Sequence, residues 1–272
     1  MARNLKITLA YDGADFRGWQ MQPGLETVQG ILSAAIGRVT GENVVPQGSG
    51  RTDAGVHALA QVASCLIASP IPPRNLLIAL NDTLPAAIRV LHVEEVLPEF
   101  HARYSARSKT YRYRILRSDI CPPQLARYVY HHPYPLDEGA MAAAAAIVIG
   151  EHDFTSFAAV DPEKSGNVGH LPRVDFLREG LSGFSDVGEE KISNVRRITR
   201  SDFSRDGDEL AYTVEGNGFL HHMVRNLVGT FLLVGKGTLR VGDVKRILEL
   251  KDRSAAGHTA PASGLWLVKV EY

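Results

Sequence analysis

Two stretches near the start of the chain decide its fold class: LKITLAY, from Leu5 to Tyr11, and TVQGILSAAIGRV, from Thr27 to Val39. The first alternates apolar and polar residues and is typical of a β-strand. The second repeats its apolar residues at helical spacing behind Thr27, a good N-cap, and therefore predicts a helix. Further along the chain, short strands are expected at 43–47 and 61–68, a helix behind Pro72 and Pro73, and a strand at 88–96. This β-α-β-β-α-β order is that of a ferredoxin-like unit.

The second part of the chain follows the same order. Strands are predicted at 109–116, 192–200, 209–215 and 265–270, an alanine-rich helix behind Asp137, and helices at about 220–234 and 241–250. The sequence therefore predicts an α+β fold of two ferredoxin-like halves, residues 1–102 and 103–272. They would form one long mixed or antiparallel sheet with helices packed on one side. An irregular insertion at about 161–190, rich in Gly, Ser, Asp and Pro, is expected to be a long surface excursion.

Composition is that of an ordinary globular protein, because 44% of the residues are hydrophobic and 22% are charged. The first residues carry no signal-peptide core, and no run is long enough to span a membrane. With only Cys65 and Cys121, a disulfide framework is not expected, so we predict a cytoplasmic protein without membrane contact.

Charge is balanced overall, with 30 basic and 30 acidic residues, but it is unevenly distributed. The stretch HARYSARSKTYRYRILR, from His101 to Arg117, contains six basic residues and no acid. A solvated strand face is the simplest interpretation. Tyr104, Tyr111 and Tyr113, however, alternate with the cations, and such a surface can hold phosphates while an aromatic ring stacks on an unpaired base.

One carboxylate stands out in the stretch QGSGRTDAGVHALAQ, from Gln47 to Gln61. Asp53 lies beside Arg51 in a glycine-bounded loop between two predicted strands, where a scaffold can present it to a cleft. Alternatively, Thr52 and Asp53 only shape a turn by accepting backbone N–H groups. A glycosidase of the usual kind needs two carboxylates, and no second acid has a comparable loop context.

Metal and nucleotide sites receive little support from the sequence. His221 and His222 are adjacent on a predicted helix, so their side chains are expected to point about 100° apart and not to share a ligand. Neither a Walker loop nor a dinucleotide fingerprint is present. Arg225 lies in the first half of the same predicted helix, from where its charge can reach a neighbouring loop.

Six motifs together resemble the tRNA pseudouridine synthases of the TruA type, in family order and over nearly the whole chain. They are YDGADFRGWQ (11–20), GRTDAGVHALAQV (50–62), FHARYSARSKTYRYRI (100–115), GEHDFTSF (150–157), HHMVRNLVG (221–229) and SGLWLVKVEY (263–272). The segment 161–190 departs from the family pattern, in which this connection is shorter and more basic.

The resemblance implies a role for each matching residue. Asp53 resembles the catalytic aspartate, and Arg51 the arginine that fills the space of the extruded base. Tyr111 is similar to the tyrosine that stacks on the target uracil. Arg225 is similar to the basic residue that pairs with the aspartate, and Leu265 to an apolar residue of the pocket.

The family resemblance also implies the reaction and the partners. Members isomerise uridine to pseudouridine at positions 38–40 of the tRNA anticodon stem-loop, after the base has been flipped out. They are homodimers and need no metal and no small-molecule cofactor.

Two other classes of function remain open at the level of the residues. A non-catalytic RNA-binding module accounts for the basic and aromatic strand but leaves Asp53 unused. A nucleoside hydrolase uses the acid but requires a metal or a second carboxylate.

Overall fold

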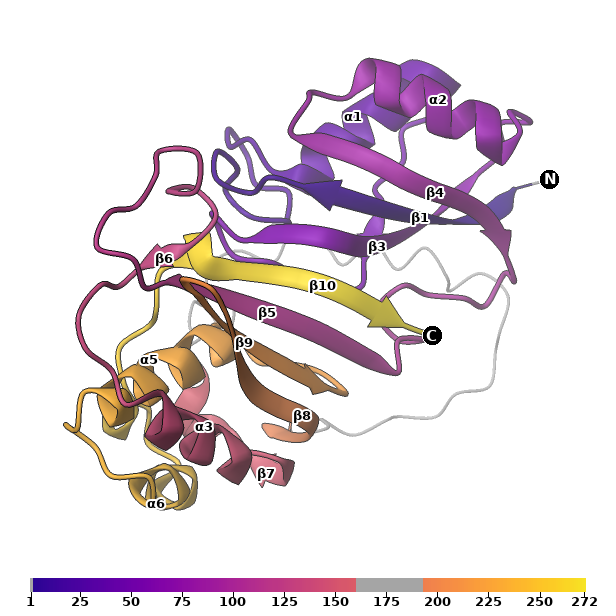
Figure 1. Cartoon of the computed structure of the whole chain (residues 1–272). Coiled ribbons are helices and arrows are strands. Elements are labelled where there is room, and N and C mark those ends of the chain that lie inside the picture. Colours follow the sequence, from indigo (N-terminus) through magenta and orange to yellow (C-terminus); the bar gives the residue numbers. More distant parts are fainter. Residues whose placement is uncertain (1, 160–192) are drawn as a thin grey trace, which may run out of the picture.

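A computed structural model describes residues 2–159 and 193–272 and contains a ten-stranded sheet (Figure 1). The insertion expected at about 161–190 lies outside the described residues. The chain is α+β, and its long sheet is mixed, with helices packed on one side, which confirms the predicted fold class.

The first part of the chain has the predicted β-α-β-β-α-β order. Its elements are β1 (Arg3–Tyr11), α1 (Val28–Thr40), β2 (Gln47–Gly48), β3 (His57–Ile67), α2 (Pro73–Thr83) and β4 (Ile88–Val96). Thr27 caps α1 as expected, because its side chain accepts a hydrogen bond from the N–H of Gly30. Gly41 closes the same helix in the left-handed conformation that favours glycine.

The second part begins with β5 (Ser108–Leu116), β6 (Tyr130–His131), α3 (Glu138–Ile147), β7 (Gly150–Asp153) and a 3₁₀ turn, Thr155–Phe157. After the undescribed segment come β8 (Val195–Asp206), β9 (Glu209–Gly216), α5 (Met223–Gly235), α6 (Asp243–Leu250), two short 3₁₀ turns and β10 (Leu265–Glu271). Asp137 caps α3, as the sequence predicts, by accepting from the N–H of Ala140. The division of the chain at residue 102 stays a prediction.

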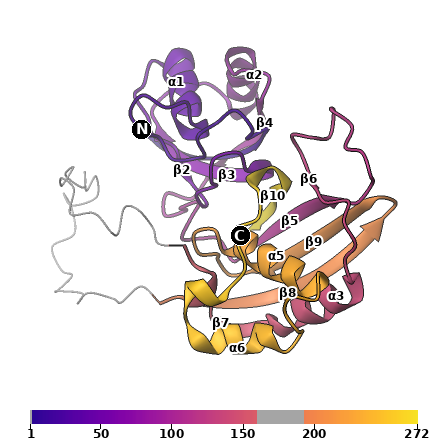
Figure 2. The same ribbon diagram turned by 90° about the vertical axis from the view of Figure 1, so that its left-hand side faces the viewer.

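The strands lie in the order β4-β1-β3-β10-β5-β9-β8-β7. The last strand, β10, connects the two parts: it runs antiparallel to β5 and parallel to β3, where Trp266 pairs with His57 and Leu267 with Ala58. Figures 1 and 2 show α1 and α2 beside β1 and β4 at one end of the sheet, and α3, α5 and α6 beside β8 at the other.

The strands predicted at 43–47, 61–68 and 192–200 have different bounds in the structure; the last of them, β8, ends at Asp206 and not at residue 200. The strand expected at 43–47 is reduced to Gln47–Gly48, which pairs with β3 only at Ser64 and Ala63. Continuing this register would pair residues 43–46 with residues 65–68, but Pro46 has no N–H to donate, and the N–H groups of Ala68 and Ser69 donate to the side chain of Glu42 instead. Strand β3 begins at His57, four residues before the expected start, because its first residues pair on both sides: His57 and Ala58 with β10, and Ala58 also with Tyr11 of β1.

The buried core lies on the helix-covered face of the sheet. Leu5, Ile7, Leu9 and Tyr11 of β1 are buried at every second position, as a strand with one covered face requires. Within residues 2–159 and 193–272, no helix combines the length and the apolar character that crossing a bilayer requires.

Candidate active site beside the joining strands

The loop that carries Asp53 connects β2 to β3, and the contacts of its buried residue Thr52 hold it in place. Thr52 is buried, its hydroxyl is 2.8 Å from the hydroxyl of Tyr11, and its carbonyl accepts from the N–H of Trp19 at 3.0 Å. Gly18 lies so close that a Cβ there would be 2.6 Å from the Thr52 carbonyl oxygen, and its φ of +87° is strained for any other residue. Glycine is therefore required opposite the loop, and the neighbouring Asp53 is presented from a fixed backbone.

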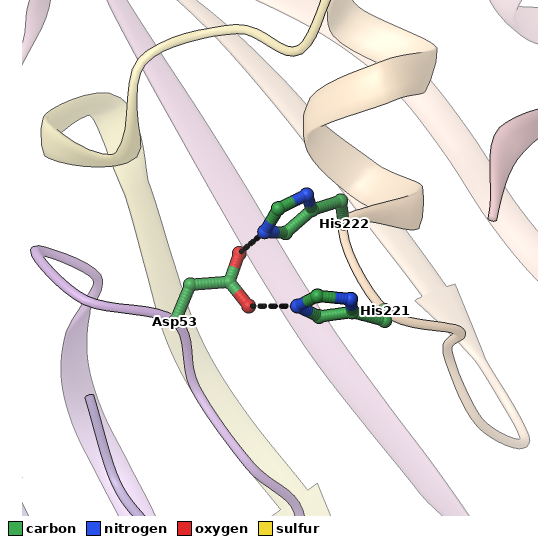
Figure 3. A group of neighbouring side chains, drawn as sticks. All are labelled: Asp53, His221 and His222. Atoms are coloured by element: carbon green, nitrogen blue, oxygen red, sulfur yellow. Dashed lines mark ion pairs between the residues drawn. The ribbon is translucent and has the colours of Figure 1, made fainter. Parts of the chain in front are cut away.

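The carboxylate of Asp53 contacts three cationic or imidazole side chains from the segment around the start of α5. Arg225 Nη1 donates to Oδ2 at 2.8 Å. The two histidines are drawn in Figure 3: His222 Nε2 lies 3.4 Å from the same oxygen, and His221 Nε2 lies 3.6 Å from Oδ1. The ion pair between Arg225 and Asp53, expected from the sequence, is confirmed. The carboxylate therefore does more than shape its own turn, because it contacts residues far away in the sequence; Arg225, for example, is 172 positions from Asp53.

Arg225 is itself held rigidly by the segment that follows α6. Its Nε donates to the carbonyl of Ala260 at 2.7 Å, while its own carbonyl accepts from the N–H of Ala260 at 3.1 Å. One turn later on the helix, Gly229 packs directly on this segment, since a Cβ there would lie 1.7 Å from the carbonyl oxygen of His258. This close approach fixes α5, and with it the guanidinium that faces Asp53.

The prediction for His221 and His222 is wrong. They were expected on a helix with diverging side chains, but α5 begins only at Met223. His222 has a φ of 59° in the left-handed region, which is uncommon for a residue with a side chain and costs backbone energy. This turn brings the two imidazole rings to 3.9 Å from each other, both directed at Asp53. The sequence signal was the pair itself, placed directly before an apolar helix.

His222 is partly buried beside Asp53. Desolvation lowers the pKa of His222, and the neighbouring charges of His221, Arg225 and Arg253 lower it further, while Asp53 acts in the opposite direction. Because the pKa falls below its ordinary value of 6.5, neutral imidazole is the main form of His222 at neutral pH.

Tyr111 and Leu265 lie on the neighbouring strands β5 and β10, and both are buried. Tyr111 is 7% exposed and its ring meets that of Phe219 edge to face at 5.0 Å. Burial raises the pKa of Tyr111, and the charges of Tyr11 and Asp53 contribute to the increase. Leu265, 6% exposed, begins β10 and pairs with Tyr113. Arg51 is exposed at the start of the Asp53 loop.

The basic and aromatic residues of β5 do not form one mixed surface, contrary to the sequence-based expectation. Successive side chains of a strand point to opposite faces, so Tyr111 and Tyr113 are buried while Arg112 is exposed. Arg114 pairs with Glu209 through two hydrogen bonds, of 2.8 and 2.7 Å. Among the three tyrosines, Tyr104 alone is well exposed, at 78%.

A smaller basic cluster lies beside the Asp53 loop and consists of Arg103, Lys109 and Arg196. Lys109 Nζ donates to the carbonyl of Ser49 at 2.5 Å. Burial, followed by the charges of Arg103 and Arg196, lowers the pKa of Lys109 to about 8. The charges of Arg103 and Arg196 thus act on Lys109, and Lys109 itself lies against the loop at Ser49 and Gly50.

Comparison with known proteins places the chain in one family. The model of the tRNA pseudouridine synthase family matches residues 7–105 and 179–272. A protein of Solibacter usitatus named tRNA pseudouridine synthase A is 48% identical over 270 residues, which cover 99% of this chain and all of the relative. Proteins of the same name from Limosilactobacillus fermentum and Caldicellulosiruptor saccharolyticus are 42% and 41% identical, over 98% and 99% of this chain and 95% and 100% of their own.

Proposed function

We propose that this chain acts on positions 38–40 of the tRNA anticodon stem-loop, with Asp53 as its catalytic residue. It belongs to the tRNA pseudouridine synthase family, whose members are isomerases of uridine in tRNA. The observation that carries this proposal is the carboxylate of Asp53, which is held at 2.8 Å by the guanidinium of Arg225. A loop residue held by contacts from both parts of the chain is suited to meet a substrate there.

The chemistry explains why one carboxylate suffices. Isomerisation breaks the N1–C1′ bond, turns the uracil and forms a C5–C1′ bond, after which C5 loses a proton and N1 gains one. Because the base is never released, no water is consumed and no second carboxylate has to activate one. Asp53 attacks the sugar or the base covalently, or removes the proton at C2′; each route needs an ionised carboxylate at this position.

Arg225 compensates the charge of Asp53 at the start of the reaction. The two side chains are 15% and 19% exposed, so the carboxylate is only partly hydrated and the guanidinium supplies the hydrogen bond and the opposite charge that water would otherwise provide. The hydrogen bond of Arg225 to the carbonyl of Ala260 keeps the guanidinium in place when the carboxylate engages the substrate.

The remaining site residues serve the flipped base. A uridine inside a stem must leave its stack before its glycosidic bond can be reached, and the vacated space has to be filled. We assign Arg51, exposed on the same loop as Asp53, to that space, Tyr111 to the face of the uracil and Leu265 to the wall of the pocket. The basic cluster of Arg103, Lys109 and Arg196 is suited to the phosphates beside it.

The proposal also covers the assembly, the location and the requirements of the enzyme. It works on tRNA as a homodimer in the cytoplasm, and it needs neither a metal nor a small-molecule cofactor for turnover. We therefore expect full activity in the presence of a chelator.

The decisive experiment uses tRNA that carries tritium at C5 of its uracils. Isomerisation exchanges the C5 hydrogen, so we expect tritium in the water, and sequencing of the product identifies the modified positions. Free uracil would mean a nucleoside hydrolase, and binding without either product would mean an RNA-binding module. Asp53→Asn protein is the matched control for tritium released by a contaminant.

A further inference from the structure

The three side chains around the start of α5 and the Asp53 loop have an arrangement that the isomerisation does not require. His221 and His222 each point Nε2 at the carboxylate of Asp53 (Figure 3). One ligand atom from each of the three residues lies within 4.8 Å of the others, and all three side chains are partly exposed. Two imidazole nitrogens and a carboxylate oxygen are therefore gathered at a site that is not closed off from solvent.

The spacing of these atoms fits a transition-metal ion. Ligand atoms about 2.0–2.1 Å from a tetrahedral zinc ion are about 3.3–3.4 Å apart. Each imidazole nitrogen lies near that length from an oxygen of Asp53, but not from the same one: His222 Nε2 is 3.4 Å from Oδ2 and His221 Nε2 is 3.6 Å from Oδ1. With one ligand atom from each residue, all three atoms lie within 4.8 Å of one another, so side-chain rotation has to bring them closer around an ion. Imidazole nitrogens with a carboxylate favour Zn²⁺, Co²⁺ or Ni²⁺ over Mg²⁺ and Ca²⁺, which prefer oxygen ligands.

The backbone holds both histidines in this arrangement before any ion binds. The carbonyl of His221 accepts from the N–H of Ala159 at 2.9 Å, and that of His222 accepts from the N–H of Asn226 at the same distance. The left-handed conformation of His222 directs its ring back towards its neighbour. An ion would therefore find ligands already in place and would need only small side-chain rotations.

Arg225 limits the strength of such a site. Its guanidinium donates to Oδ2 of Asp53. A carboxylate that binds a metal often accepts a hydrogen bond from such a group, which is not itself a ligand. The positive charge of Arg225, however, repels a dication at short range. We therefore expect a reversible site that is weaker than a structural zinc site.

We propose that Asp53, His221 and His222 form a binding site for a transition-metal dication such as Zn²⁺, and that its occupation inhibits the enzyme by engaging the carboxylate of Asp53. The inhibitory part of this proposal rests on the proposed function, because it requires Asp53 to be catalytic. The binding part stands on the geometry alone.

Metal binding is tested first, without reference to activity. Tag-free, chelator-treated protein is titrated with Co²⁺, whose visible absorption reports coordination by nitrogen and oxygen, and Zn²⁺ is then added as a competitor. We expect one Co²⁺ per chain, displaced by Zn²⁺. Single His221→Gln and His222→Gln variants should each weaken binding by about tenfold or more, since each removes a ligand. His92→Gln is the matched control, because His92 is an exposed histidine beside a carboxylate, 3.9 Å from Glu94, and its loss should change nothing.

Inhibition is tested with the same proteins and the tritium-release reaction. Zn²⁺ should inhibit the wild-type protein at the concentration that displaces Co²⁺, and a chelator should restore the rate. In the His221→Gln and His222→Gln variants, each compared with its own metal-free rate, the inhibiting concentration should rise by about tenfold or more. Unchanged Co²⁺ binding in both variants would overturn the site, and site-specific binding without inhibition would overturn its effect on catalysis. A wild-type protein inactive even with a chelator would instead count against the proposed function, while the Co²⁺ titration would still decide on the site.

Discussion

At the scale of single residues, Asp53 is defined by what surrounds its carboxylate. Asn in its place keeps the shape and can still accept from Arg225, so we expect Asp53→Asn to fold normally and to bind tRNA nearly as the wild type does. Turnover should be lost, because an amide is neither a nucleophile nor a base under these conditions. Tritium release and tRNA binding are measured in parallel, with Asp202→Asn, at an exposed ion pair of β8, as the control. Substantial activity in purified Asp53→Asn would remove Asp53 from the mechanism.

Arg225 provides a second prediction at this scale. Arg225→Ala leaves the Asp53 carboxylate without its guanidinium, at a cost of about 1–3 kcal/mol because the pair is only partly buried. The rate should fall by about 10²-fold or more, and Arg225→Lys should lose less, since the charge remains while the bond to Ala260 is weakened.

Urea unfolding and initial rates measure the two effects of Arg225→Ala. The matched control is Arg246→Ala, which breaks an exposed pair with Asp243 on α6 and should be nearly neutral. An alanine variant of Arg225 with the stability and rate of the wild type would contradict the assigned role.

Tyr111 is tested by two substitutions that keep its position filled. Its ring packs on Phe219, so Tyr111→Ala would leave a cavity and confuse binding with stability. Tyr111→Phe keeps the aromatic face and should bind tRNA as the wild type does, whereas Tyr111→Leu should weaken binding by about 1–3 kcal/mol through the lost stacking. Equal dissociation constants for the Phe and Leu variants would show that Tyr111 is only a core residue.

The site was predictable from the sequence in part, and the histidines show why the rest was not. Asp53 and Arg225 stand in recognisable contexts, a glycine-bounded loop and the first half of a helix. The orientation of His221 and His222 depends on one backbone angle, the positive φ of His222. Apolar periodicity does not specify at which residue a helix begins, and α5 begins only at Met223.

At the scale of elements, the placement of helix α5 determines where Arg225 lies in the site. Gly229→Ala would place a Cβ 1.7 Å from a backbone oxygen, that of His258, so the helix has to move away from the segment that binds Arg225. We expect a loss of about 1–3 kcal/mol in unfolding free energy and a lower rate with little change in tRNA affinity. Gly37→Ala in α1 is the control: its Cβ would meet the nearest atom at 3.5 Å, an ordinary contact.

The two glycine variants should therefore differ in sign. In an open helix position alanine is favoured over glycine by up to about 1 kcal/mol, so Gly37→Ala should be neutral or stabilising. Denaturant midpoints and initial rates of both variants answer the question. If Gly229→Ala matched the wild type in both, α5 would not be pressed against residues 257–258 in solution.

The elements themselves followed from local pattern where pattern was strong. The strand Ile88–Val96 and the caps Thr27 and Asp137 agree with the prediction, since each depends on neighbouring residues alone. The start of β3 did not agree, because it depends on pairing with β1 and with β10, strands that are distant from it in the chain. Such pairing is a long-range property that local periodicity does not contain.

At the scale of the whole molecule, charge distribution matters more than net charge. The chain carries 30 basic and 30 acidic residues, so its overall field gives little attraction for an anionic partner. Attraction must come from local groups, and Arg103, Lys109 and Arg196 lie together beside the Asp53 loop. Arg114, farther along β5, contributes less, since it is already paired with Glu209.

We therefore expect tRNA affinity to fall steeply with salt although the protein is neutral, because each phosphate contact releases counterions. Arg103→Gln should reduce the slope of log affinity against log salt concentration by about 1, as the loss of one phosphate contact does. Lys245→Gln, at an exposed position of α6, changes net charge by the same amount and should leave the slope unaltered. Dissociation constants at several salt concentrations decide between the two origins. Equal slopes for the Arg103 and Lys245 variants would mean that overall charge governs binding, and a salt-independent affinity would mean that phosphates contribute little.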